Sequence, residues 1–287
     1  MTTPDLPVSL PTWCRTVLDD LVERVAVVPG VAAVVLGGSW ARGRGVEGSD
    51  LDVGLLYHDD APLDVAKLQT VIEEVNDDLT TQATPLGGWG PWVNGGAWLH
   101  IDEHPVDLLY RSIDRYRSTL ENARNGYAEH DYLQQPPYGF QSTIYLAEMD
   151  TAIALHDPTG VAAELKSEVR PYPVALRSGL ARGYHWGAEF AVTNARKPAV
   201  RGDIYAAIGC VSRAIAFLVQ SLYAVNEVYF ISDKGAIAEV AAMAIRPTDW
   251  TGRVQACLSV TSEPSQLSEA VDAASALVEE CRAFVYG

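Results

Sequence analysis

The hydrophobic positions in the first half of the chain alternate between helical and strand spacing. Apolar residues three or four positions apart predict amphipathic helices over residues 11–27 and 64–79. Short, nearly continuous apolar runs predict buried strands over residues 31–36 and 51–57. Helices and strands therefore follow one another in this part of the chain, which is typical of a mixed α and β domain.

A loop and a hairpin follow these elements. The stretch 82–96 contains five glycines and two prolines and predicts a loop. Two apolar runs, 98–101 and 106–110, flank the polar residues 102–105, and this arrangement predicts a β-hairpin. With the two earlier strands, the hairpin predicts a small mixed sheet with flanking helices.

The second half of the chain has helical periodicity almost throughout. The last strand candidate is 230–231, and Pro-Pro-Tyr-Gly at 136–139 is a candidate hinge. The predicted fold class is α+β, with an N-terminal mixed domain over 1–140 and an all-helical domain over 141–287. The helices predicted in the second domain are 161–169, 174–195, 203–223, 234–245 and 266–284.

Composition and charge exclude several classes of protein. The 287 residues are 48% hydrophobic and 20% charged, which excludes collagen-like and intrinsically disordered chains. There are 21 basic and 37 acidic residues, a formal net charge of −16, and a field of this sign repels phosphate backbones. We therefore expect neither DNA nor a membrane surface as a partner. The charge would suit a cationic small molecule, although solubility or a generally acidic proteome is the better explanation.

The cysteines and the N-terminus place further limits on the protein. The four cysteines, at positions 14, 210, 257 and 281, lack the short spacings of zinc or redox motifs, which predicts reduced thiols. Residues 1–13 have no basic start and no long apolar run, so no signal peptide is predicted. No stretch reaches the ~18 consecutive apolar residues of a membrane span. A cytoplasmic protein is expected.

The segment from Val34 to Leu56 carries the clearest chemical pattern. A buried strand leads into Gly37, Gly38 and Ser39, where missing side chains allow backbone N–H groups to approach an anion. A short helix is predicted from Ser39, with its positive end toward the same place. Eleven residues later, Asp50 and Asp52 lie two positions apart at a strand, so both carboxylates share one face. Two adjacent carboxylates repel each other unless a cation neutralises their charge, and Mg²⁺ prefers oxygen ligands.

These residues resemble the signature of the polymerase-beta-type nucleotidyltransferase superfamily. Gly38-Ser39 and Asp50-Leu51-Asp52-Val53 match its glycine-serine turn and its Asp-hydrophobic-Asp-hydrophobic strand. The resemblance implies two Mg²⁺ ions, ATP or another nucleoside triphosphate as co-substrate, and a third carboxylate on a neighbouring strand. Asp107 lies where that carboxylate is expected. The domain plan is similar to that of nucleotidyltransferases that modify aminoglycoside and lincosamide antibiotics.

Asp107 and Asp102 compete for the third position. Pairing Ile101 with Val106 across the hairpin would place His100 opposite Asp107. Asp102 falls at the turn, where aspartate is common, whereas Asp107 lies inside an apolar strand. Asp107 is therefore predicted as a metal ligand, as the general base, or as both.

Several further residues are candidates for phosphate contact. Arg42 and Arg44 follow the glycine turn, Ser49 precedes Asp50, and Arg111 ends the predicted Asp107 strand. In the antibiotic-modifying relatives a lysine of the helical domain typically reaches the phosphates, and the resemblance assigns that role to Lys234. Its alternative is a helix-terminal surface residue.

The sequence gives weaker signals for the residues that bind the acceptor. Trp89, Trp92 and Trp98 could hold a base or a sugar, or could serve only as packing residues, and Glu189 could face an acceptor or solvent. The predicted function is Mg²⁺-dependent transfer of a nucleoside monophosphate, AMP from ATP, to a hydroxyl of a small molecule, releasing pyrophosphate. The alternatives are a transferase acting on tRNA or protein, and a non-catalytic nucleotide-binding module.

Overall fold

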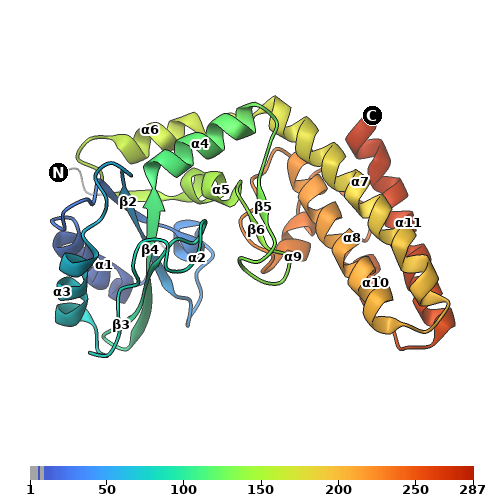
Figure 1. Cartoon of the computed structure of the whole chain (residues 1–287), viewed down its shortest axis with the longest axis horizontal. Helices are drawn as coiled ribbons and strands as arrows, with labels where there is room; N and C mark the ends of the chain where they lie inside the picture. The colour runs from blue at the N-terminus through green and yellow to red at the C-terminus, as the bar shows by residue number, and fades with distance from the viewer. Residues whose placement is uncertain (1–5, 7–9) are drawn as a thin grey trace. The chain divides into compact units, whose positions relative to one another are not determined.

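The computed structural model describes Leu6 and residues 10–287, and it divides the chain into two compact units (Figure 1). Unit 1 comprises residues 1–121 and 145–171, and unit 2 comprises residues 122–144 and 172–287. The predicted boundary at residue 140 thus falls inside the segment 122–144 of unit 2. The chain returns to unit 1 afterwards, because residues 145–171 supply the fifth strand of its sheet and a helix that packs against that sheet.

Unit 1 is built on a five-stranded mixed sheet. The strand order is β3-β4-β2-β1-β7, in which β2 and β4 are parallel and the other neighbours are antiparallel. The strand β7 adds to the edge at β1 and lies in the half of the chain that was predicted to be helical. The strands are β1 (Ala33–Leu36), β2 (Leu51–Tyr57), β3 (Gly96–Ile101), β4 (His104–Ser112) and β7 (Ile153–His156).

One face of this sheet is covered by two amphipathic helices, α1 and α3, which lie side by side (Figure 1). Alternate residues of β2, such as Leu51 and Val53, are buried in the core with the apolar faces of these helices. The residues between them, including Asp52, therefore point to the opposite face. The helices of this part are α1 (Thr12–Val25), α2 (Gly38–Ala41), α3 (Val65–Val75), α4 (Ile113–Arg124), α5 (Ile144–Thr151) and α6 (Val161–Glu168).

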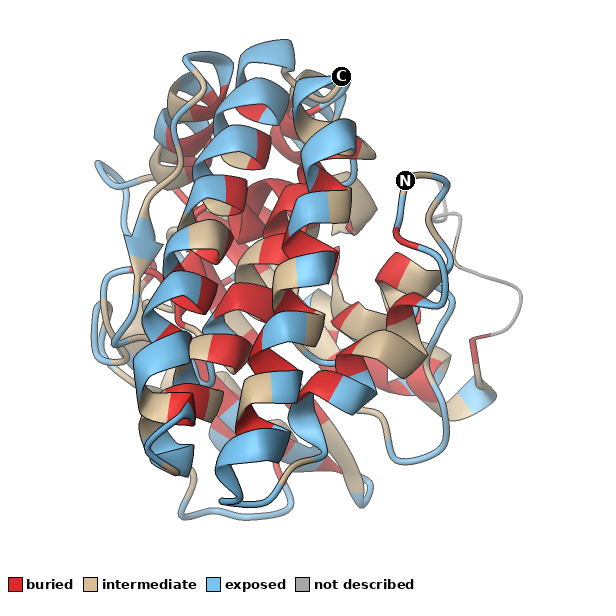
Figure 2. Cartoon of the chain, turned by 90° about the vertical axis from the view of Figure 1, so that its right-hand side faces the viewer, coloured by how far each residue is buried: buried red, intermediate tan, exposed pale blue. Residues whose placement is uncertain are grey.

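Unit 2 is a helical bundle with a two-stranded ribbon. The inner faces of its long helices are buried and their outer faces are exposed (Figure 2). Among the described residues, α8 alone is long and apolar enough to cross a membrane, and 67% of its apolar window is buried inside the protein, as in a core helix. The elements are β5 (His130–Asp131), β6 (Phe140–Gln141), α7 (Val174–Ala199), α8 (Ile204–Val225), α9 (Ala236–Ala241), α10 (Trp250–Leu258) and α11 (Pro264–Tyr286).

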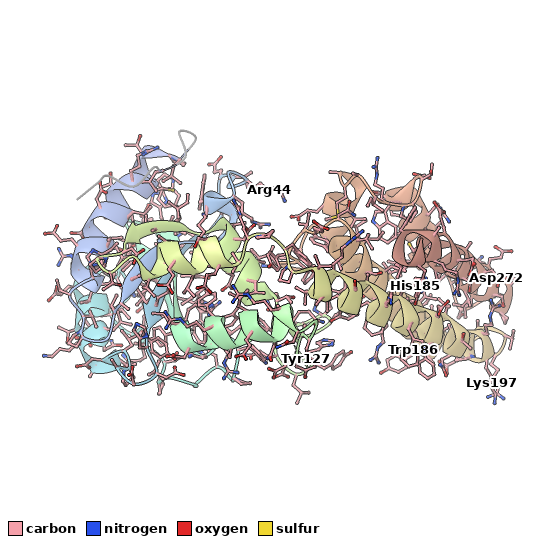
Figure 3. The ribbon with its side chains drawn as sticks, turned by 90° about the horizontal axis from the view of Figure 1, so that it is seen from above. Arg44, Tyr127, His185, Trp186, Lys197 and Asp272 are labelled. Carbon is pink, nitrogen blue, oxygen red and sulfur yellow. The ribbon has the colours of Figure 1, made fainter. Side chains whose placement is uncertain are left out.

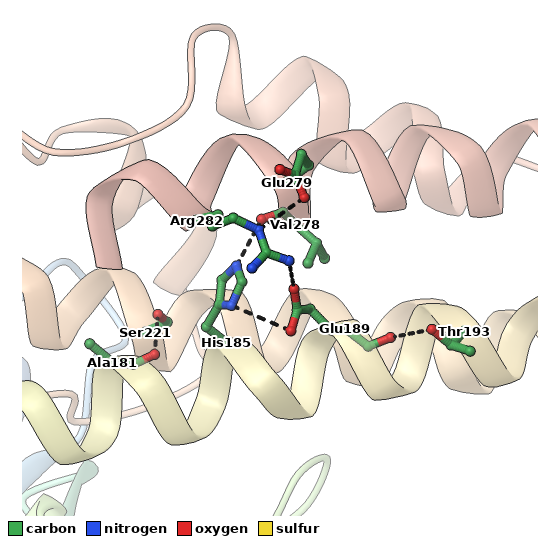
Figure 4. A network of polar contacts seen from close by, with 8 residues as sticks. All are labelled: Ala181, His185, Glu189, Thr193, Ser221, Val278, Glu279 and Arg282. Carbon is green, nitrogen blue, oxygen red and sulfur yellow. Dashed lines mark hydrogen bonds and ion pairs between the residues drawn. The ribbon is translucent and has the colours of Figure 1, made fainter. Parts of the chain in front are cut away.

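A polar network joins α7 to α11 and accounts for Glu189 (Figure 4). His185 is fully buried, and its Nε2 lies 2.9 Å from the backbone oxygen of Val278. Glu189 forms an ion pair with Arg282 and lies 4.0 Å from His185 Nδ1. Glu189 therefore has a structural role between two helices.

The predicted α+β fold with a helical C-terminal part is confirmed. The β2 strand has the predicted bounds, and the helix predicted over 64–79 is α3, which begins after the N-cap Asp64 and ends at Val75. The structure adds α4, α5, α10 and the short strands β5 and β6, and residues 230–231 form no strand.

Candidate active site

Two carboxylates lie on the face of the sheet opposite α1 and α3. In the parallel pairing of β2 and β4, Asp52 lies directly opposite Asp107. Both side chains are half-buried and point away from the core, because Leu51, Val53, Val106 and Leu108 occupy the other face. Asp50 is exposed and lies just before β2. The structure thus brings Asp107 to the strand next to Asp50 and Asp52, as the sequence predicted.

The electrostatics of Asp52 reflect this crowding. Burial raises the pKa of the Asp52 carboxyl, and the negative charges of Asp107 and Asp50 add to the rise, so that the pKa is about 7. Glu148 of α5 raises it further, whereas Arg111 lowers it. Glu148 has no sequence signal of its own, because only the packing of α5 on the sheet brings it near the aspartates.

The glycine turn lies directly against the Asp52 carboxylate. The N–H of Gly37 donates to the Asp52 backbone oxygen at 2.9 Å. Gly38 has φ of 60°, and a Cβ placed on it would lie 1.7 Å from Asp52 Oδ2. Glycine is therefore required at position 38 both by its backbone conformation and by the carboxylate beside it.

This contact gives a first prediction, for Gly38→Ala. The substitution should cost about 1–2 kcal/mol in backbone strain and displace the Asp52 carboxylate, so nucleotidyl transfer should fall by about a hundredfold. Gly43→Ala is the matched control, because Gly43 has φ of 65° and nothing within 4 Å of its added Cβ. Melting temperature and turnover should be measured for both. Equal turnover in the two variants would contradict the role of the contact.

The other predicted phosphate-binding residues of unit 1 surround the same turn. Ser39 is half-buried, and its backbone oxygen accepts from the N–H of Arg44. Arg42 donates from Nε to the Gly38 oxygen at 3.3 Å, and the Ser49 hydroxyl accepts from the N–H of Val46 at 3.0 Å. Arg44 is exposed and labelled in Figure 3. Because α2 is only one turn long, an anion at this turn would be held mainly by backbone N–H groups and little by a helix dipole.

The predicted hairpin register is wrong by two residues. Asp102 and Glu103 both have positive φ and form a two-residue turn, so Ile101 pairs with His104 and His100 with Pro105. Trp98 is therefore the cross-strand neighbour of Asp107, in place of His100. A shift of two residues keeps every side chain on its predicted face.

An aromatic pair borders Asp107 as a consequence. Trp98 is 64% exposed, and its ring stacks on that of Trp89, with centroids 4.6 Å apart. The Trp92 side chain is instead buried and has Arg115 over its ring at 4.9 Å. The stacked pair lies next to Asp107, whereas Trp92 packs inside the unit.

Arg111 is not available for phosphate contact. Its side chain is 5% exposed, and its Nε and Nη2 donate to the two carboxylate oxygens of Glu148 at 2.7 and 2.8 Å. Lys234, the remaining predicted phosphate ligand, belongs to unit 2, where it is exposed in the segment before α9. Its role stays a prediction.

The carboxylates fit a shared magnesium site. Within Leu6 and residues 10–287, no three His, Cys, Asp or Glu side chains form a complete metal-binding group. Mg²⁺ usually takes one or two protein carboxylates and completes its shell with water and substrate phosphates. Asp52 and Asp107, with Asp50 nearby, suit such a site. Burial, together with the charges of Asp107 and Asp50, raises the pKa of Asp52, and a bound cation would stabilise its charged form.

One region of the chain matches a known protein family. Residues 14–85 match the nucleotidyltransferase domain family. No curated protein matches the chain. Among solved structures, a nucleotidyltransferase-like protein from Exiguobacterium sibiricum 255-15 is similar, with a TM-score of 0.48 and 11% identity over 95% of this chain and 77% of that chain.

The chain therefore carries a nucleotidyltransferase domain of the polymerase-beta superfamily. The matched residues include the glycine turn, Asp50 and Asp52, whereas Asp107 lies beyond them. The protein is a transferase of the nucleotidyltransferase type.

Proposed function

We propose that this nucleotidyltransferase moves AMP from ATP to a hydroxyl group of a small molecule and releases pyrophosphate. The observation that carries the proposal is the facing pair Asp52 and Asp107, with the Gly38 backbone against the Asp52 carboxylate. The acceptor oxygen would bond to the α-phosphorus, and the bond from that phosphorus to the bridging oxygen of the β-phosphate would break. The departing group is pyrophosphate.

Each residue has a defined part in this reaction. Asp50, Asp52 and Asp107 would hold Mg²⁺, which when bound supplies positive charge to the triphosphate and the leaving group. Asp107 would also accept the proton of the acceptor hydroxyl, since its carboxylate lies opposite Asp52 on the adjacent strand. The backbone at Gly37 and Gly38, together with Ser39, Arg42 and Ser49, would hold the phosphates.

The acceptor class is supported by charge. The net charge of −16 disfavours tRNA and other polyanions as acceptors, so a small molecule is the better match. An antibiotic of the aminoglycoside or lincosamide kind is one such candidate. We place the reaction in the cytoplasm.

The direct test is pyrophosphate release from each of the four nucleoside triphosphates with Mg²⁺. The acceptor panel should contain hydroxyl compounds that are cationic, neutral and anionic, including an aminoglycoside and a lincosamide, and also tRNA and protein. Release that requires a small molecule, prefers ATP and is lost in Asp52→Asn would support the proposal. Modification of tRNA or protein alone would overturn the acceptor class.

A second prediction concerns Lys234. If its ammonium contacts the β- or γ-phosphate, Lys234→Ala should weaken ATP binding by about ten- to a hundredfold. Within the described residues, Lys234 is exposed and has no ion pair that would occupy it. Calorimetric titration with a non-hydrolysable ATP analogue measures the effect.

The control for this prediction is Lys197→Ala. Lys197 is exposed on the last turn of α7, so its removal changes the net charge equally (Figure 3). Equal affinity of the two variants for the analogue would mean that Lys234 is a surface residue without a phosphate contact.

A further inference from the structure

Unit 2 contains a cavity of about 710 Å³ between α7, α8 and residues 126–130. This volume lies within the range of sites for drug-sized molecules, roughly 300–1,000 Å³. The lining residues all belong to unit 2, whereas the carboxylates on β2 and β4 belong to unit 1.

Among the described residues, five large aromatic side chains line the cavity. They are Tyr127, Tyr184, Trp186, Phe190 and Phe217. The rings of Trp186 and Phe190 stack at 5.5 Å and are 63% and 59% exposed. In Figure 3 the labelled Tyr127 and Trp186 lie along the same side of α7. Flat aromatic faces at an open mouth are suited to a planar ring system.

Three glycines of α7 line the cavity, and one of them leaves space there. A Cβ on Gly179 would lie 2.3 Å from the Gly126 oxygen, and one on Gly187 would lie 2.8 Å from the Phe217 ring, so close packing requires both glycines. Gly183, midway between them, has nothing within 4 Å of an added Cβ. Helix packing therefore does not account for glycine at 183, and the missing side chain leaves the cavity open.

One side chain, that of Arg213, gives the cavity a positive charge. Arg213 is the only Lys, Arg, Asp or Glu among the described lining residues. Its guanidinium lies over the rings of Phe217 and Tyr132, at 5.2 and 6.0 Å, and it has neither a hydrogen bond nor an ion pair within the described chain. Asp233 lines a small adjoining crevice that shares Arg213, and no ion pair joins the two. The guanidinium is thus available to an anionic group.

We propose that this cavity binds a flat aromatic small molecule that carries an acidic group, with its rings between the aromatic walls and its anion at Arg213. The proposal is independent of nucleotidyl transfer, because binding is measured without nucleotide or metal. It also excludes polycationic ligands from this cavity, since no lining carboxylate would receive them.

The first experiment uses the full chain and two matched fluorescent probes. These are 8-anilinonaphthalene-1-sulfonate and its uncharged analogue N-phenyl-1-naphthylamine, which lacks the sulfonate. Gly183→Leu should lower the affinity for both probes by about tenfold or more, because leucine fills the space and also favours a helix. Arg213→Met should lower the affinity for the sulfonate alone by about tenfold. The control Gly209→Leu changes an exposed α8 glycine with open space outside the lining, and it should bind both probes like the wild type.

A second readout comes from Cys210. This thiol lines the cavity and is half-buried, whereas Cys14, Cys257 and Cys281 are buried. The sulfonate should therefore slow modification of Cys210 by a thiol reagent, and it should not do so in Gly183→Leu. Wild-type affinity of Gly183→Leu, or an Arg213→Met variant that loses both probes equally, would overturn the proposal. A second copy of the chain covering these aromatics would also overturn it, and it would appear as a concentration-dependent mass that the probe does not change.

Discussion

Asp52→Asn is expected to abolish nucleotidyl transfer and at the same time to stabilise the metal-free protein above pH 7. The loss of activity should be about a thousandfold or more, equivalent to roughly 4 kcal/mol of transition-state stabilisation. The amide keeps the shape of the side chain but removes the charge that would hold Mg²⁺. Turnover and melting temperature should be measured on the same samples.

The stability gain follows from the raised pKa of Asp52. The pKa is about 7 in the folded chain, against an ordinary value of 3.8. The folded state therefore binds the proton more tightly, so wild-type stability falls as the pH rises from about 4 to 7. The variant lacks this penalty. Its advantage should be absent near pH 4 and complete above pH 7, at about 2–4 kcal/mol or roughly 5–10 °C in melting temperature.

Two controls make this result specific. Mg²⁺ should raise the melting temperature of the wild type and leave that of Asp52→Asn unchanged, since binding to the folded state alone is stabilising. Asp102→Asn makes the same chemical change at the exposed hairpin turn, where φ is 50°. It should alter neither turnover nor the pH dependence. A melting-temperature difference between Asp52→Asn and the wild type that is constant from pH 4 to 8 would contradict the assigned origin of the effect.

The face carrying Asp52 and Asp107 could be predicted because it depends on local pattern. Alternation along 51–54 and 106–110 fixes which side chains are buried, and burial of Leu51 and Val106 places the aspartates on the other face. A register error of two residues in the hairpin left that result intact. It changed only the neighbour of Asp107, from His100 to Trp98.

What could not be predicted depends on pairing between distant segments. The strand β7 is four residues long and is held by pairing with β1, more than 110 residues earlier in the chain. The register of β3 and β4 is set by two turn residues in a left-handed conformation, Asp102 and Glu103. Glycine at these positions would have predicted that conformation, whereas aspartate and glutamate do not. The role of Arg111 likewise depended on Glu148, which only the fold brings near.

Breaking the pair of Arg111 and Glu148 is expected to have the largest effect on stability. Both carboxylate oxygens of Glu148 accept hydrogen bonds from the Arg111 guanidinium, and Arg111 Nη1 also donates to the Tyr110 backbone oxygen at 3.0 Å. Burial lowers the pKa of Arg111, but the charge and hydrogen bonds of Glu148 raise it by more, so the arginine stays charged. The pair ties α5 to the sheet.

Removing either partner alone leaves a charge without compensation. Arg111→Met and Glu148→Met should each cost about 3–5 kcal/mol. Glu148→Met should be the more costly, because the Arg111 side chain is 5% exposed and that of Glu148 is 27% exposed. The double variant should recover most of the loss, since two apolar side chains of similar length replace a buried ion pair at little net cost. Chemical denaturation of the four proteins gives the coupling.

The same pair should tune Asp52, and in opposite directions for its two members. The charge of Arg111 lowers the pKa of Asp52 and that of Glu148 raises it. Arg111→Met should therefore move the acid limb of kcat/KM to higher pH, and Glu148→Met should move it to lower pH. Both variants lose stability, so a purely structural role would affect their profiles alike. Shifts in the same direction, or none, would mean that Arg111 and Glu148 support the sheet without acting on the charge of Asp52.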